Sequence, residues 1–339
     1  MEILKALLKR ILVLGMLMFQ VKLLEAKELC KYYKTPKGPL HAVEGLSFSI
    51  DDQTTLGVVG ESGCGKSTLG RVIMGLHEPT GGSLSFEGQD VTHPSKAQRR
   101  ELNHKIQMIF QDPASSLDPR MSVSDLITEP MKAMRLFKSK QERDNKVAEL
   151  MDTVGLARRL AYAYPHELDG GRRQRIGIAR ALAVDPKFIV CDEPVSALDV
   201  SIQAQILNLL QDLQEDKGLT YMFITHNLSV VRHISHKILV MYLGCQVELC
   251  DSKELFQRPL HPYTKGLLSA IPIPSIHVER KNIVMNGEVT SPINPKPGCR
   301  FAARCPYAKD KCHQELPAVE EVLPGHFCAC HYVRELNEL

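Results

Sequence analysis

The sequence predicts an α/β domain with a mainly parallel sheet, followed by a smaller cysteine-containing segment. Apolar runs of strand length alternate with amphipathic helical segments over most of the chain. One run, Leu56–Val59, leads into a glycine-rich turn that opens a helix, and another, Phe188–Cys191, ends in an acidic pair. In a parallel sheet both features lie at the carboxyl edge of the strands, where ligands bind.

The chain opens with a short appendage, residues 1–21, ahead of the first expected strand. Its apolar stretch, residues 11–19, follows two basic residues and so imitates a signal peptide. This stretch is too short to span a bilayer, which takes about 20 residues, and no small-residue cleavage site follows it. We therefore expect an appendage rather than a targeting segment, with Met16 or Met18 as an alternative start.

Alternating apolar residues predict two paired strands, over residues 22–30 and 42–50. Further short strands are expected at Ser83–Phe86 and at Ile106–Phe110. Residues 112–168 then show helical periods between turn signals and no clear strand. This pattern predicts a helical insertion within the α/β domain.

The alternation of strands and helices resumes after this insertion, and the domain is expected to end near residue 250. Prolines from Pro272 onward predict a loop-rich tail. The expected elements of the second half are a helix over Arg172–Val184, a strand at Phe188–Cys191, a helix over 200–217, a strand at Tyr221–Thr225, a helix from 227 and a strand at Lys237–Leu243.

The glycine-rich turn, residues 60–68, has the pattern G-x-x-x-x-G-K-[ST] of a phosphate-binding loop. Its glycines let successive N–H groups point into one concavity, and the helix that follows adds partial positive charge. Lys66 is expected to reach the β- and γ-phosphates, and the Ser67 hydroxyl to bind Mg²⁺. The residues predicted to bind a nucleoside triphosphate here are Gly60, Glu61, Ser62, Gly63, Cys64, Gly65, Lys66, Ser67 and Thr68.

The acidic pair, Asp192 and Glu193, follows the buried strand Phe188–Cys191. Asp192 is predicted to hold Mg²⁺ together with the serine of the phosphate loop. Glu193 is then placed to orient or deprotonate a water molecule in line with the γ-phosphate. The pair therefore predicts an enzyme that hydrolyses its nucleotide.

Further motifs occur in a fixed order: Gln111 at a strand end, His-Glu-Leu-Asp-Gly-Gly-Arg-Arg-Gln-Arg at 166–175, and His226 just after a strand. Between them lie Ser196, Ala197, Leu198 and Asp199, in the position of a D-loop. This order resembles the ATPase cassette of ABC transporters. The resemblance implies a P-loop NTPase cassette over residues 22–255, with a RecA-like core, an antiparallel β subdomain and a helical subdomain at about 112–168.

The resemblance also assigns roles to single residues. It implies that Gln111 touches Mg²⁺ and water and couples the helical subdomain to the nucleotide. It implies that His226 contacts the γ-phosphate, and that Tyr33, with Tyr32 as the alternative, stacks on adenine.

One motif departs from the family. The signature Leu-Ser-Gly-Gly-Gln, which faces the partner's ATP in an ABC dimer, reads Leu168, Asp169, Gly170, Gly171 and Arg172 here. An ionised Asp169 only accepts hydrogen bonds and would repel phosphate, although it still caps a helix as well as serine does. We expect folding to survive and one composite ATP site to be compromised, with Arg172 as a candidate to offset the repulsion.

Residues 256–339 follow the cassette, and Arg258–Thr264 and Gly287–Pro295 within them resemble the C-terminal extension of oligopeptide/dipeptide importers. The resemblance is greatest to the second of the two non-identical ATPases of such importers. It implies ATP and Mg²⁺ as ligands, a partner ATPase forming a heterodimer, two permeases, an extracytoplasmic binding protein and a location on the cytoplasmic face of the membrane.

The residues leave two alternatives open for this function. Importers of nickel and glutathione share the branch, and soluble ABC ATPases of DNA repair or translation are the rival class. Such soluble proteins typically carry long coiled-coil insertions or two cassettes, and this chain has neither pattern. The net charge is +3 with no long basic run, which gives no indication of a nucleic-acid partner.

Five of the ten cysteines crowd into residues 299–330, a layout that suits a local metal site in a reducing compartment. The predicted ligands are Cys299, Cys305, Cys312 and Cys330, with Cys328 as an extra candidate. Relatives carry a [4Fe–4S] cluster at such positions, and four thiolates also suit zinc. Reduced cysteines that only pack, and a redox-sensing tail, are the alternatives.

Overall fold

The computed structural model describes residues 22–271, 285, 287 and 291–339. The predicted appendage at 1–21 and most of the segment 272–290 lie outside the described residues. Within the part of the chain that is described, every helix is too short or too polar to cross a membrane.

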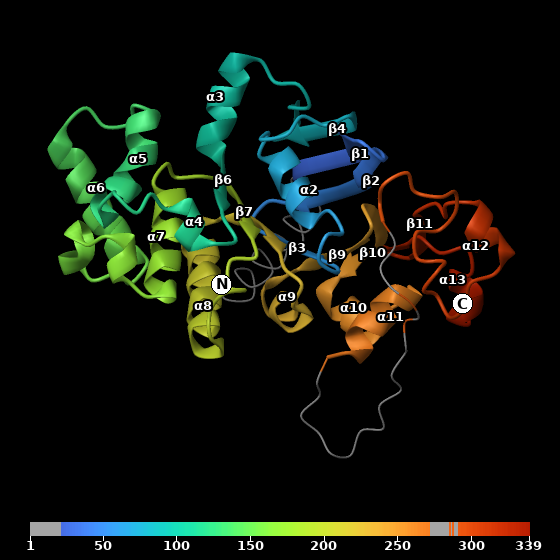
Figure 1. The fold of residues 1–339 in the computed structure, drawn as a ribbon. Coiled ribbons are helices and arrows are strands. Elements are labelled where there is room, and N and C mark those ends of the chain that lie inside the picture. The colour runs from blue at the N-terminus through green and yellow to red at the C-terminus, as the bar shows by residue number, and fades with distance from the viewer. Residues whose placement is uncertain (1–21, 272–284, 286, 288–290) are drawn as a thin grey trace, which may run out of the picture.

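A parallel sheet forms the centre of the fold (Figure 1). Its strands lie in the order β6-β7-β8-β3-β9, so that the phosphate-loop strand β3 lies between β8 and β9. β3, β7 and β8 are buried along their whole length, as expected for parallel strands covered on both faces. The bounds are β3 Thr55–Val59, β6 Ile106–Ile109, β7 Phe188–Asp192, β8 Thr220–Ile224 and β9 Lys237–Tyr242.

An antiparallel layer continues the sheet on one side. The predicted pair of strands is confirmed, but both are longer than expected and form a hairpin that turns at residues 36–37. β10 joins this layer to the parallel strands, because it pairs with β2 at Cys245 and runs antiparallel to β9. The strands are β1 Lys22–Thr35, β2 Gly38–Asp51, β4 Gly81–Phe86, β5 Gln89–Asp90 and β10 Cys245–Asp251.

Alternate residues of the parallel strands face two different cores. Phe188 and Met222 pack with α2 and the antiparallel layer, whereas Ile189 and Tyr221 pack with the helices of the other face. The helices around the sheet are α2 Lys66–Ile73, α3 Lys96–Lys105, α7 Gly170–Leu182, α8 Val200–Lys217 and α9 Leu228–Ile234. Sequence analysis did not predict α3, and it started α7 two residues too late, because it placed the first helical residue after the glycine pair.

The segment predicted to be a helical insertion contains helices and, among its described residues, no strand. It lies at the left of Figure 1, on the opposite side of the sheet from the C-terminal segment. Its elements are α4 Pro113–Ser116, α5 Val123–Ala133, α6 Lys140–Thr153 and two short 3-10 turns at Arg158–Tyr162 and Pro165–Glu167.

The C-terminal segment is more ordered than the loop-rich tail that its prolines predict. β12 pairs with β10, at Glu248 opposite Cys328, so the segment adds a small hairpin to the main sheet. Local sequence did not reveal this pairing, because it joins residues far apart in the chain. The elements are α10 Ser252–Gln257, α11 Pro262–Ser269, α12 Asp310–Gln314, β11 Glu320–Leu323, β12 His326–Cys328 and α13 Val333–Leu336.

Candidate nucleotide-binding and catalytic site

The phosphate loop connects β3 to α2 and has the predicted backbone geometry. Gly60, Gly63 and Gly65 all adopt positive φ, as the prediction from their glycines requires. Gly65 admits no side chain, because a Cβ there would lie 1.9 Å from the carbonyl oxygen of Ala42. At Gly63 a Cβ would meet nothing within 4 Å, so this part of the loop borders open space.

Lys66 begins α2 and is 4% exposed. Its Nζ donates to the carbonyl oxygens of Gly60, at 2.8 Å, and of Glu61, at 2.9 Å. The ammonium group is thus held against the loop that surrounds the predicted phosphate position. A phosphate in that position would offer it a charged acceptor in place of two carbonyls.

The two predicted Mg²⁺ ligands from distant parts of the chain lie together. The Ser67 hydroxyl donates to Asp192 Oδ1 at 2.9 Å. Asp192 is 2% exposed, and its burial raises the pKa of the carboxyl group. A buried carboxylate needs a compensating charge, and a divalent cation beside the serine would supply it.

Glu193 forms a second polar group at the same edge of the sheet. Gln111 Nε2 donates to Glu193 Oε2 at 2.9 Å, and His226 Nδ1 lies 3.2 Å from Glu193 Oε1. The three residues follow β6, β7 and β8, so adjacent strand ends bring them together. Gln111 therefore contacts the predicted base directly, whereas its predicted contact with Mg²⁺ stays a prediction.

The two tyrosines proposed for adenine differ in their surroundings. The Tyr32 ring stacks on His41 at a centroid distance of 4.2 Å, and its hydroxyl donates to Glu44 at 2.8 Å. The Tyr33 ring meets His77 edge-on at 5.7 Å. Lys31 Nζ lies over the Tyr33 ring at 5.0 Å from its centroid, and the role of Tyr33 at adenine stays a prediction.

The signature segment starts α7 in the way predicted. Asp169 is the N-cap of the helix, and its Oδ1 accepts the Arg172 backbone N–H at 2.8 Å. Arg172 Nε also lies 3.4 Å from Asp169 Oδ2, with both side chains more than half exposed. Arg172 therefore lies where it can offset part of the Asp169 charge. Gly170 and Gly171 follow, and a Cβ on Gly171 would approach Ile202 of α8 to 2.8 Å.

The predicted D-loop, Ser196–Asp199, connects the acidic pair to α8. Ser196 Oγ donates to the backbone oxygen of Glu193 at 3.1 Å, and Asp199 caps α8 by accepting the Ile202 N–H at 2.9 Å. Ser196, Ala197 and Asp199 are exposed. This loop therefore connects Glu193, the candidate base, to an exposed stretch of chain beside α7.

The four predicted cysteine ligands line one small cavity. Burial raises the pKa of Cys299 to about 12, and it also raises the pKa of Cys305 and Cys330. Cys312 completes the set, and none of the four is in a disulfide. Cys328 lies outside the residues that line the cavity, which favours Cys330 of the two candidates.

The spacing of these thiols bears on the metal. Tetrahedral zinc with Zn–S bonds of about 2.3 Å holds its sulfurs roughly 3.8 Å apart. Among the described residues, no three of the four thiols lie within 4.8 Å of one another. The choice between an iron–sulfur cluster and zinc therefore stays a prediction.

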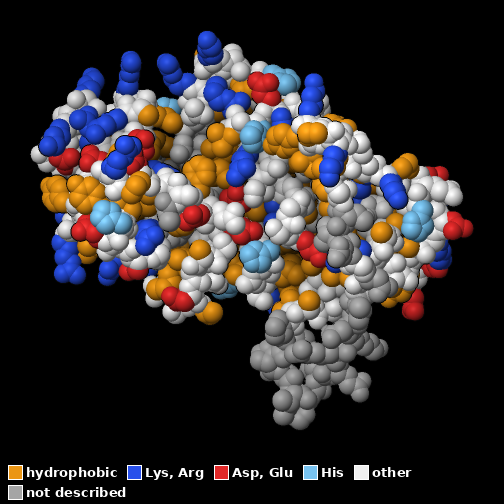
Figure 2. Space-filling model, viewed as in Figure 1, with side chains coloured by type: hydrophobic (Ala, Val, Ile, Leu, Met, Phe, Trp, Pro, Cys, Tyr) orange, Lys and Arg blue, Asp and Glu red, His pale blue; other side chains and the backbone are white. Residues whose placement is uncertain are grey.

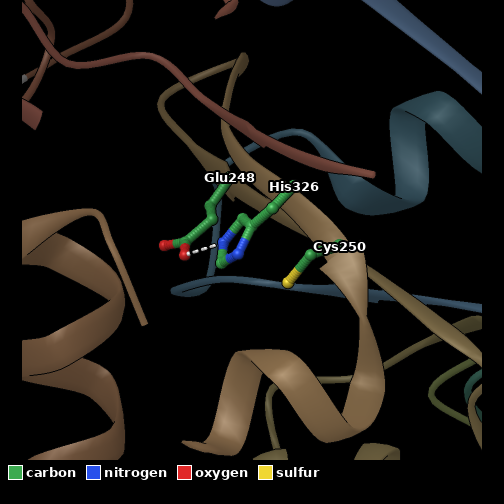
Figure 3. Close-up of side chains that lie close together, drawn as sticks. All are labelled: Glu248, Cys250 and His326. Atoms are coloured by element: carbon green, nitrogen blue, oxygen red, sulfur yellow. Dashed lines mark hydrogen bonds and ion pairs between the residues drawn. The ribbon is translucent and has the colours of Figure 1, made fainter. Parts of the chain in front are cut away.

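A buried group that sequence analysis missed is drawn in Figure 3: Glu248, Cys250 and His326. Glu248 accepts hydrogen bonds from the backbone N–H groups of Leu260 and His261, at 2.7 and 2.9 Å, and lies 2.7 Å from His326 Nε2. The Glu248 oxygens are therefore engaged in holding the start of α11 and β12. Glu248 and His326 are 78 positions apart in the chain, so local sequence carries no signal for this contact.

A cavity of about 750 Å³ is lined by none of the phosphate-loop residues and by neither Asp192 nor Glu193. It lies between β1, β2, β10 and the C-terminal segment, and its walls include Phe48, Leu316 and Phe327. We place the candidate site at the phosphate loop because the groups with phosphate and proton-transfer chemistry converge there.

Comparison with known proteins gives two family matches and several relatives. Residues 43–196 match the ABC transporter family, and residues 247–312 match the oligopeptide/dipeptide transporter C-terminal region. The oligopeptide transport ATP-binding protein OppF of Bacillus subtilis is 51% identical over 311 residues, which cover 91% of this chain and 96% of the relative. OppF of Salmonella typhimurium is 50% identical over 298 residues, covering 87% and 89%.

Solved structures give the same architecture. The ATP-binding cassette MJ0796, in a dimeric post-hydrolysis state with ADP and phosphate, matches with a TM-score of 0.60 and 29% identity over 65% of this chain and 95% of that one. The protein cbiO1 of Clostridium perfringens, part of the complex cbiONQ, matches with a TM-score of 0.62 and 27% identity over 70% and 91%. The predicted cassette fold is confirmed.

Proposed function

This chain belongs to the ABC transporter ATPases with an oligopeptide/dipeptide C-terminal region, and on that premise we propose that it powers peptide import by hydrolysing ATP. The observation that carries the proposal is the convergence of Lys66, the Ser67–Asp192 pair and Glu193 at one sheet edge. These groups supply a phosphate-binding cation, oxygen ligands for Mg²⁺ and a base for water.

In the proposed reaction Lys66 exchanges its two carbonyl acceptors for oxygens of the β- and γ-phosphates. Ser67, Asp192 and Gln111 would hold Mg²⁺, which neutralises the charge on the phosphates. Glu193 accepts a proton from water as that water attacks the γ-phosphorus and ADP leaves.

Two residues complete the proposed site. His226 contacts the γ-phosphate from the side of Glu193, because its ring already lies against that carboxylate. Tyr33 stacks on adenine from the β1–β2 hairpin. Both roles come from the family resemblance and the positions of the side chains.

We propose that a second, non-identical cassette completes two ATP sites with this chain. The site on this chain's phosphate loop borrows the partner's signature and is competent. The site on the partner's phosphate loop faces Asp169, whose carboxylate lies at an exposed helix start. Like charge at that position slows hydrolysis there.

The proposed permease contact is a groove of about 440 Å³ in the helical segment, between α5, α6 and the turn at Arg158–Tyr162. Tyr162, at its edge, is 84% exposed. Figure 2 shows basic and hydrophobic side chains close together over these helices, at the left of the view. One of the two permeases bound there would hold the chain on the cytoplasmic face of the membrane, and an extracytoplasmic binding protein would deliver the cargo.

We propose iron–sulfur as the group held by Cys299, Cys305, Cys312 and Cys330, with zinc as the alternative. A bound cluster would supply iron–thiolate bonds that crosslink the C-terminal segment. Anaerobically purified protein should be brown and contain iron and sulfide, and Cys312→Ser should lower the metal content. Stoichiometric zinc would select the alternative, and metal-free protein of unchanged stability would leave the thiols as packing.

Reconstitution tests the transport function. The chain, its partner cassette and its permeases are placed in vesicles with the extracytoplasmic binding protein, and ATP-dependent uptake of a labelled oligopeptide, Ni²⁺ and glutathione is measured. We expect peptide uptake that Glu193→Gln abolishes. Uptake of nickel or glutathione alone would reassign the cargo, and ATPase activity in a protein that binds no permease would favour the soluble class.

A further inference from the structure

The segment Cys299–Cys305 joins the cysteine cavity to the nucleotide site. Its two end cysteines line the cavity, and hydrogen bonds from Ala302 N to Cys299 O, 3.0 Å, and from Arg304 N to Phe301 O, 2.9 Å, make it a compact turn. Between the cysteines lie two arginines, Arg300 and Arg304. Both point away from the cavity toward residues of the cassette.

Arg304 contacts the phosphate loop itself. Its two terminal nitrogens donate to the two carboxylate oxygens of Glu61, at 2.7 and 3.1 Å. Arg304 is 8% exposed and lies over the Tyr242 ring at 5.8 Å, so this two-point contact is shielded from water. Glu61 belongs to the predicted phosphate loop, and its carboxylate pairs with the C-terminal segment.

The backbone of Glu61 is held from the same side. Its N–H donates to the Tyr263 hydroxyl of α11 at 2.9 Å, and its carbonyl accepts from Lys66 Nζ. Residues after the cassette therefore fix the loop residue that also holds the phosphate-binding lysine. A displacement of Arg304 would move one of the two acceptors of Lys66.

Arg300 makes a matching contact at the other end of the nucleotide site. Its terminal nitrogen lies 3.3 Å from Glu44 Oε2, and Glu44 in turn accepts from Tyr32. The neighbouring backbone adds a hydrogen bond from His41 N to the Pro292 oxygen at 3.0 Å. The hairpin that presents Tyr33 is thus also in contact with the C-terminal segment.

We propose that Arg304 is a positioning residue for the phosphate loop and that, through the turn Cys299–Cys305, the cysteine cavity and the ATP site are energetically coupled. This proposal rests on ATP binding at residues 60–68. The two sites share one rigid turn, so a group that binds the thiols and a nucleotide that binds the loop both bear on the Arg304–Glu61 contact. Coupling of two binding events is reciprocal, so each must change the affinity or reactivity of the other.

An ion pair that only fastens the C-terminal segment to the cassette would behave differently. Its removal would lower the free energy of unfolding and leave nucleotide affinity unchanged. Lys309 supplies a matched control, because it pairs with Glu335 at 2.6 Å within the same segment and does not contact the phosphate loop. Comparing variants of Arg304 with a variant of Lys309 therefore shows whether Arg304 positions the phosphate loop or only attaches the C-terminal segment to the cassette.

The first test is the ATP affinity of the full-length chain, measured by calorimetry for the wild type, Arg304→Gln, Arg304→Lys and Lys309→Gln. We expect about tenfold weaker binding for Arg304→Gln, a smaller loss for Arg304→Lys, which keeps the charge but loses the two-point contact, and no change for Lys309→Gln. A lower melting temperature with unchanged ATP affinity in both Arg304 variants would overturn the proposal. No ATP binding by the wild type would instead contradict the proposed function.

The second test uses the wild-type chain and so does not depend on a variant that folds. Iodoacetamide alkylation of Cys299 and Cys305 is followed by mass spectrometry with and without ATP. Reciprocity predicts a rate changed severalfold by ATP in the wild type. Equal rates with and without ATP in the wild type would overturn the coupling.

Discussion

Two helices of this molecule begin with opposite arrangements at their amino ends. α2 begins after Gly65, which offers no side chain to cap the first turn. α7 begins after Asp169, whose carboxylate accepts the Arg172 N–H at 2.8 Å. The backbone N–H groups at the start of α2 have no side-chain cap and can bind an anion. At the start of α7 the Asp169 carboxylate already occupies that position.

The difference shows how one chain contributes unequally to two ATP sites. Lys66 and the Ser67–Asp192 pair lie at the α2 end, where positive charge and metal ligands meet a phosphate. At the start of α7, the partial positive charge of the helix end is instead met by the carboxylate of Asp169. A capped end keeps the fold, but it gives up the attraction for phosphate that a serine cap would retain.

The largest effect is expected from Glu193→Gln, which tests whether the sheet edge beside α2 is catalytic. The amide cannot accept a proton from water, so turnover should fall by about 10²–10⁴-fold. ATP affinity should stay near the wild-type value, and the protein should accumulate as an ATP-bound dimer with its partner. Hydrolysis at the wild-type rate would remove Glu193 as the base.

A smaller effect is expected on binding when the cation at the α2 end is removed. Lys66→Ala should weaken ATP binding about 100-fold, because a hydrogen bond between charged groups contributes up to ~3 kcal/mol. Calorimetric titration measures the affinity, and Lys309→Gln is the control for loss of a lysine elsewhere. An unchanged affinity in Lys66→Ala would contradict the assignment of the phosphate loop.

The proposed effect of Asp169 at the start of α7 is tested by removing its charge while keeping the helix cap. Asp169→Ser should raise hydrolysis at the partner's site about fivefold, since like charges at ~4 Å in water repel by about 1 kcal/mol. Asp169→Asn also caps the helix without a charge and should give a similar gain. If neither variant gains activity, the Arg172 ion pair at 3.4 Å already offsets the repulsion.

The smallest expected effect concerns stability. Asp169→Ala should lower the free energy of unfolding by about 1 kcal/mol, the usual cost of a lost helix cap. Asp199→Ala is the matched control, because Asp199 caps α8 through the same contact three residues on. Urea unfolding should give similar losses for both, and no loss for Asp169→Ala would show that the cap contributes nothing.

The parallel core and the phosphate edge were predictable because their signals are local. The glycines, Lys66 and the acidic pair lie next to apolar strands. The contacts of the C-terminal segment were not predictable. Arg304 meets Glu61 across 243 residues, and β12 pairs with β10, so tertiary packing rather than local pattern decides both.

Single-turnover hydrolysis in the assembled transporter tests the central claim, that this chain's phosphate loop forms the competent ATP site. The assay compares Lys66→Ala with the equivalent lysine variant of the partner cassette. The account predicts that Lys66→Ala removes most of the hydrolysis and leaves only the slow turnover of the partner's site, whereas the partner's variant keeps most of it, because Asp169 already slows the partner's site. Equal loss from the two variants would contradict the account and show that both sites work.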